Sequence, residues 1–176
     1  MTRTEHRHAA DGLRELARAG WSGAEGVPPG LPGFVASAFA PSIAEVAGRV
    51  LATGSAPERT ALVLASAGGD LETAVATAEA VDAGKLPGAL LFFQSVPNAV
   101  LGHIAKRWSL TGPVICLSPD APEQAEAEAR SVARLLLRAG EADRVLILTA
   151  EQHPEEPGLG TASAVLLAAE SDGGAP

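Results

Sequence analysis

Four histidines are the first residues to consider for acid–base or metal chemistry, because the imidazole pKa lies close to neutral pH. His6 and His8 form a pair near the N-terminus, but a metal centre needs more ligands than two imidazoles supply. His103 lies off the apolar stripe of a predicted helix, which favours a surface or interface role. His153 falls in a loop rich in Pro and Glu, where we expect it to be solvated. The histidines therefore predict neither a metal centre nor a catalytic triad.

The remaining candidates for chemistry are one thiol and one glycine-rich turn. Cys116 lies within a predicted strand, where a thiol usually acts as a small buried apolar group, and a reactive thiolate needs a helix N-terminus or a cation beside it. Residues 66–70 (SAGGD) stand between a strand and a helix, the position of a phosphate loop. They lack both G-x-G-x-x-G and G-K-[ST], and Asp70 would repel phosphate. We interpret them as a tight strand–helix turn and predict no cofactor.

Charge and composition exclude several classes of function. The chain has 176 residues and a formal net charge of −8, so its surface repels nucleic-acid phosphates. A single cysteine cannot form an internal disulfide, which fits a reducing compartment. The N-terminus lacks the apolar core of a secretory signal, and no apolar run approaches the roughly 20 residues that cross a bilayer. We expect a cytoplasmic protein with no nucleic-acid or membrane partner.

Apolar runs and periodicity define the elements that would position any site. Residues 60–65, 114–118 and 144–149 predict buried strands, and residues 161–169 predict a fourth strand at an edge of the sheet. Helices are expected at 41–51, 71–83, 97–108 and 122–139. Ser42 is the expected cap of the first, Asp70 of the second, and Asp120 or Ser118 of the last. Residues 13–20 carry a short helical pattern, and residues 1–33 show no strand. This alternation predicts an α/β fold with a mixed, mostly parallel sheet of about four or five strands covered by helices.

One stretch also resembles a known family. Residues 94–118 (QSVPNAVLGHIAKRWSLTGPVICLS) are similar to part of the N-terminal half of β-ketoacyl synthases, the condensing enzymes of fatty-acid and polyketide assembly. Four further segments, on both sides of this stretch, resemble the family and follow its order: LPGFVASAFAPSIAEVAGRVL, TALVLASAGGD, AGEADRVLILTAE and GTASAVLLAAE. The resemblance implies a thiolase-like half-domain over residues 31–170, after a partly flexible extension of residues 1–30 and before a disordered tail of residues 171–176.

The departures from the family concern catalysis. The position of the nucleophilic cysteine aligns with Ala121, or with Asp120 if the register slips by one, and neither side chain can form a thioester. The family's two catalytic histidines belong to a second half that lies beyond Pro176. The resemblance therefore implies a truncated pseudoenzyme, although it leaves the question of enzymatic activity open.

The resemblance further implies a role in association. We interpret the chain as a catalytically inactive partner or scaffold subunit in polyketide or fatty-acid-like biosynthesis. It would form a homodimer, or a heterodimer with a full ketosynthase in the manner of chain-length factors, and an acyl carrier protein is a further expected partner. Two alternatives stay open: a decarboxylase or acyltransferase completed by a partner, suggested by Gln124, and an acyl-ligand binding module.

The family dimerises by antiparallel pairing of the strand that precedes the nucleophile. Transferred to this sequence, the resemblance implies a dimer interface made by Phe92, Phe93, Val96, Val114, Ile115, Cys116, Leu117 and Ser118.

Overall fold

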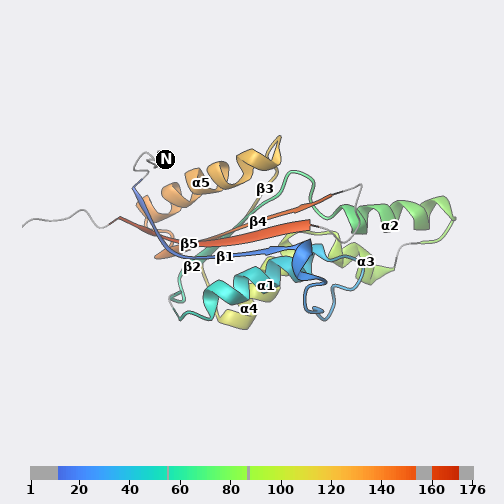
Figure 1. Ribbon diagram of the computed structural model, residues 1–176, viewed down its shortest axis with the longest axis horizontal. Coiled ribbons are helices and arrows are strands. Elements are labelled where there is room, and N and C mark those ends of the chain that lie inside the picture. The colour runs from blue at the N-terminus through green and yellow to red at the C-terminus, as the bar shows by residue number, and fades with distance from the viewer. Residues whose placement is uncertain (1–11, 55, 87, 154–159, 171–176) are drawn as a thin grey trace, which may run out of the picture.

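A computed structural model describes residues 12–54, 56–86, 88–153 and 160–170, which form a mixed five-stranded sheet between two layers of helices (Figure 1). The strand order is β1-β5-β4-β2-β3. β2 runs parallel to β3 and β4, whereas β5 runs antiparallel to β4 and β1. The predicted α/β class with a mixed, helix-covered sheet is confirmed. The strands are β1 (Leu13–Ser22), β2 (Thr60–Ala65), β3 (Val114–Leu117), β4 (Arg144–Gln152) and β5 (Gly160–Ala169).

The helices divide between the two faces of the sheet and one of its ends. In Figure 1, α5 covers one face, α1 and α4 cover the other, and α2 extends beyond the end of the strands beside α3. α2 buries only Thr73, so nearly all of this helix is open to solvent. The helices are α1 (Phe39–Leu51), α2 (Leu71–Asp82), α3 (Ala89–Gln94), α4 (Asn98–Trp108) and α5 (Ala125–Arg138), with short 3₁₀ turns η1 (Gly23–Glu25) and η2 (Pro122–Gln124).

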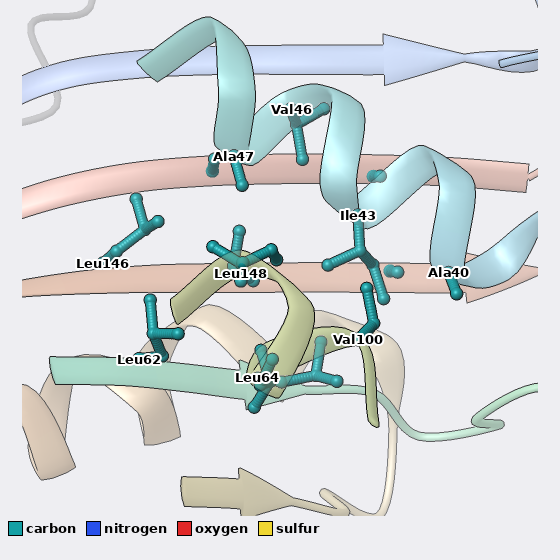
Figure 2. Packing of buried hydrophobic residues seen from close by; sticks show 14 of the residues in the cluster. Ala40, Ile43, Val46, Ala47, Leu62, Leu64, Val100, Leu146 and Leu148 are labelled. Carbon is teal, nitrogen blue, oxygen red and sulfur yellow. The ribbon is translucent and has the colours of Figure 1, made fainter. Parts of the chain in front are cut away.

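The core consists of two apolar layers, one on each side of the sheet. β2 is buried at every position because alternate side chains enter opposite layers: Leu62 and Leu64 pack on the α1 side, and Ala61 and Val63 pack on the α5 side. Figure 2 shows Ile43 and other α1 side chains meeting the leucines of β2 and β4. On the other side the buried α5 residues are alanines, whose small side chains bring the helix close to the sheet. The prediction that β2 and β4 are buried strands is confirmed.

Three predictions about the sheet are wrong. Residues 13–20 form most of strand β1 rather than a helix, because β5 offers this segment a partner of the same length and pairing satisfies its backbone. β5 is therefore an interior strand and not an edge. β3 is the edge strand opposite β1, and its exposure alternates along its length instead of being low throughout. An apolar run indicates a strand but does not give its place in the sheet.

The predicted helix caps are confirmed for one helix only. Asp70 caps α2 by accepting a hydrogen bond from the Thr73 backbone N–H at 3.0 Å. Ser42 lies inside α1, where its hydroxyl donates to the Phe39 carbonyl at 2.8 Å, so it does not act as the cap. η2 begins after Ala121 without a side-chain cap, so the prediction of Asp120 or Ser118 as a cap is also wrong.

Some sequence predictions concern residues that the structure does not describe. His6 and His8, and the tail of residues 171–176, lie outside the described residues. No helix in the described part of the chain is both long enough and apolar enough to cross a membrane.

Candidate partner-binding surface

β3 presents an open backbone edge at the end of the sheet. The carbonyls of Pro113 and Leu117 accept hydrogen bonds from backbone N–H groups of Leu62 and of Ser66, which follows β2, so these carbonyls face inward. Because backbone direction alternates along a strand, the N–H and C=O groups of Val114 and Cys116 face outward. Within the described residues, no strand pairs with this edge. An open edge of this kind is a template for pairing with another chain.

The side chains of β3 differ between its two faces. Ile115 and Leu117 pack against the α5 layer and are half-buried. Val114 and Cys116 lie on the other face and are exposed, which corrects the prediction of a buried cysteine. The Cys116 thiol donates to the Asn98 side-chain oxygen at 2.8 Å, and partial burial raises the pKa of that thiol. Cys116 is thus held as a neutral thiol and lacks the environment of a nucleophile.

Helix α3, which packs against α4, adds a second exposed apolar surface. Its segment exposes four large apolar side chains: Leu90, Phe92, Phe93 and Val96. Phe92 is 74% exposed, the most of the four. α4 packs against both α3 and β3 and so joins the two parts of this surface. We call Leu90, Phe92, Phe93 and Val96 together with β3 the apolar edge.

Buried polar contacts fix α3 in place. The Gln94 side chain is 5% exposed, and its oxygen accepts hydrogen bonds from the backbone N–H groups of Val35 and Ala36 at 2.6 and 2.9 Å. Its amide nitrogen donates to the Leu90 carbonyl at 3.1 Å. The Phe93 ring also contacts Phe34, with ring centroids 5.7 Å apart. α3 is therefore anchored in place while its outer aromatic side chains remain uncovered.

The start of α5 carries no nucleophile. Ala121 has extended backbone angles (φ −148°, ψ 148°) and stands directly before η2 and α5. Asp120 precedes it and is exposed. Gln124 is exposed at the end of η2, three residues after Ala121. A methyl group therefore stands where the helix N-terminus could have activated a thiol.

The glycine turn after β2 is occupied by the chain's own carboxylate. Glu151, from β4, accepts hydrogen bonds from the Ala67 and Gly68 backbone N–H groups at 2.6 and 3.1 Å. The Gly69 N–H donates to the Ser66 hydroxyl at 2.9 Å. These donors are satisfied within the fold, which agrees with the interpretation of residues 66–70 as a structural turn.

The two described histidines do not converge on α5 or on Cys116 to form a catalytic site. His103 is partly buried on α4 and lies in a T-shaped arrangement with Phe34, at 6.4 Å between ring centroids. Its Nε2 is buried and has no hydrogen-bond partner among the described residues. His153 is exposed, as the sequence predicted. In the described ranges, no three metal-ligating side chains lie close enough together to hold an ion.

Sequence reasoning identified Phe92, Phe93 and Val96 only through the family resemblance, and it missed helix α3 and Leu90. The available signal was the apolar run ALLFF, which has no polar face although it precedes a polar stretch. Such a run inside a short helix cannot be buried on all sides by one small domain.

The solved structures that this chain resembles include ketosynthases. A chain from a ketosynthase in complex with its chain length factor, from Xenorhabdus doucetiae, matches with a TM-score of 0.68 and 15% identity, covering 91% of this chain and 80% of that one. A β-ketoacyl synthase from Burkholderia phymatum matches with a TM-score of 0.57 and 14% identity, over 74% of this chain and 42% of that one. The ketosynthase from module 1 of the bacillaene synthase of Bacillus amyloliquefaciens also gives 0.57, with 15% identity, over 77% and 29%.

These matches rest on shape rather than on sequence identity. No protein-family model and no curated protein matches the sequence. The chain spans less than half of the Burkholderia and Bacillus chains but most of the chain matched in the Xenorhabdus complex. The protein therefore has the thiolase-like fold of the ketosynthases, as its sequence motifs indicated, over a part of their length.

Proposed function

We propose that the chain is a non-catalytic partner subunit of a ketosynthase, bound through the apolar edge. The observation that carries the proposal is an open strand edge at β3 beside the exposed aromatic side chains of α3. Pairing would continue the sheet into the partner and would cover Phe92, Phe93 and Val96 at the same time.

The backbone geometry of β3 specifies how such pairing would occur. Val114 and Cys116 direct their free N–H and C=O groups outward and Ile115 directs its own toward β2. An antiparallel partner strand can therefore form a pair of hydrogen bonds at each outward-facing residue. Val114 and Cys116 also turn their exposed side chains toward α4, where α3 provides the adjoining apolar surface.

The fold comparison supports a subunit role more than an independent enzyme. The Xenorhabdus complex joins a ketosynthase to a chain length factor, and its matched chain is only slightly longer than this one, to judge from the shares of 91% and 80%. The aligned position of the nucleophile holds Ala121, so thioester chemistry at this helix would depend on groups from a partner. Gln124 is exposed, and among the described residues its side chain has no hydrogen-bond partner that would favour the decarboxylase alternative.

Mixing the chain with a full-length ketosynthase from the same genome tests the proposal, with the solution mass measured by size exclusion and light scattering. We expect a one-to-one complex with the wild-type chain. Val114→Pro should abolish it, because proline removes an outward N–H that the isolated chain does not use. Val114→Ala is the matched control, because it keeps the N–H and trims the side chain.

Two results would contradict the proposal. One is a folded Val114→Pro protein, verified by circular dichroism, that binds the ketosynthase as tightly as the wild type. The other is a stable self-dimer that excludes the ketosynthase, which would replace the heterodimer with a homodimer.

A further inference from the structure

We propose that the loop before α1 and the outer side of α4 form a binding site for an amphiphilic anion, a free long-chain carboxylate. The site consists of an apolar groove and a cationic hollow that share the segment Gly30, Leu31 and Pro32. Neither part includes the strand edge of β3, so the test below requires no protein partner.

The groove is suited to an alkyl chain. It has a volume of about 570 Å³, within the roughly 300–1,000 Å³ of small-ligand sites. Leu31 and Phe34 are buried and form its floor. Val27 and Val35 line it while remaining 90% and 76% exposed, so two large apolar side chains have no cover. An alkyl chain lying between them would remove this apolar surface from water.

The hollow is suited to an anionic group. It has a volume of about 510 Å³, and its charged or titratable lining residues are His103, Lys106 and Arg107, with no carboxylate among them. In the described part of the chain, Lys106 and Arg107 form no ion pair, whereas Arg18, Arg49, Arg59 and Arg130 all do. In a chain of net charge −8, a hollow whose charged lining residues, Lys106 and Arg107, are both cationic is a place where an anion is attracted.

One contact shows that the groove and the hollow are adjacent. A second shows in which of them the carboxylate of the ligand binds. The His103 ring, in the hollow, makes a T-shaped contact with the Phe34 ring, which lines the groove. Glu72, which also lines the groove, accepts a hydrogen bond from the Ala38 N–H at 2.9 Å. Its negative charge would repel a carboxylate there. The carboxylate therefore binds at Lys106 and Arg107, and the alkyl chain follows the groove.

The simplest competing explanation is that Lys106 and Arg107 only balance the dipole at the C-terminal end of α4. That role needs neither a hollow nor an apolar groove beside it. It also predicts an effect of these cations on helix stability and none on ligand binding. The two explanations therefore differ in what a binding measurement should detect.

Calorimetric titration of the purified chain with laurate, dodecanol and acetate separates the contributions of the two parts. We expect laurate, kept below its micelle concentration, to bind more tightly than dodecanol, and acetate not to bind. The double substitution Lys106→Gln and Arg107→Gln should weaken laurate at least tenfold and leave dodecanol unchanged, because the charge-assisted contacts are lost. Val35→Asp should weaken both alkyl ligands. Lys85→Gln, another exposed lysine, is the matched control.

Several outcomes would overturn the proposal. These are no laurate binding at about 1 mM, laurate affinity within about twofold of the wild type in the double variant, and acetate binding as tight as laurate. A further one is a wild-type chain that does not bind laurate and whose solution mass falls on the substitution Val35→Asp. The groove would then be covered by a second copy of the chain. Lys106, Arg107 and Val35 are exposed, so these substitutions should leave the fold intact.

Discussion

The outer side of α5 and the apolar edge are both open to solvent, but their chemistry is opposite. α5 is linked to β1 by Arg18, which bonds Glu15 and Glu126 at 2.9 and 2.8 Å, and by Arg130, which bonds the same two carboxylates. The apolar edge instead exposes aromatic side chains and an open strand. A surface that satisfies its own charges can remain in water, whereas a surface that leaves apolar groups and strand hydrogen bonds unused is built to be covered.

The contrast also bears on which of the two surfaces is the better candidate for binding a partner. The ion pairs between α5 and β1 satisfy the charged groups of Arg18, Glu126 and Arg130 within the chain, so these groups need no partner from another protein. The contrast supports the proposal that a partner binds at the β3 end of the sheet and not over α5. Substitutions on each surface can test whether the partner binds at the apolar edge or over α5.

The largest expected effect comes from placing one charge on each surface. Phe92→Asp should weaken the complex with the ketosynthase by about 100-fold, because a carboxylate would be buried in an apolar contact. Leu135→Asp is the matched control on α5, since Leu135 is 67% exposed, close to the value for Phe92. It should leave affinity within about twofold. Calorimetry or a surface-binding assay measures the affinity of both variants for the ketosynthase. Equal losses of affinity for the two variants would remove the distinction between the surfaces.

A second substitution should displace strand β3 of the apolar edge from its neighbour β2. Gly112 precedes β3, and a Cβ there would lie 2.5 Å from the Thr60 carbonyl carbon and oxygen. Gly112→Ala must push β3 away from β2, so we expect it to cost about 1–3 kcal/mol in the free energy of unfolding and to weaken association. Urea denaturation gives the first quantity. A variant with unchanged midpoint would show that β3 tolerates displacement. Gly48→Ala is the control, because a Cβ there meets nothing within 4 Å.

The smallest expected effect concerns the ion pairs of α5. The Arg18 guanidinium, hydrogen-bonded to Glu126, lowers the pKa of that carboxyl from 4.5 to about 2. Its stabilising effect is thus present above pH 4.5 and is lost as the pH falls toward 2. Because the pair is about one-third exposed, Glu126→Gln should cost only about 1 kcal/mol at pH 7.

The pH dependence gives this prediction its test. The difference in unfolding free energy between Glu126→Gln and the wild type should shrink as the pH is lowered from 4.5 to 2. A difference that is independent of pH over this range would mean that the ion pair is not its source. Binding to the ketosynthase should not change at pH 7, since α5 lies outside the apolar edge.

Much of the architecture could be predicted from local sequence. β2 and β4 each contain an uninterrupted apolar run, Asp70 has the side chain and position of a cap, and Gly84 has the positive φ (67°) that ends α2. The order of the ketosynthase-like motifs indicated the fold, and the absence of a cysteine at Ala121 can be read from the residues themselves. These features depend on a few neighbouring positions, so the sequence alone determines them.

The order of the strands was decided only by tertiary structure. Residues 13–20 are rich in Leu, Ala, Arg and Glu, which favour a helix, yet they form β1 because nine residue pairs with β5 outweigh that local preference. For the same reason β5 became an interior strand, and β1 and β3 became the two edges of the sheet. The groove by Phe34 and its cationic neighbours on α4 likewise join segments some 70 residues apart in sequence. Pairing and packing between distant segments are cooperative, and no window of sequence contains them.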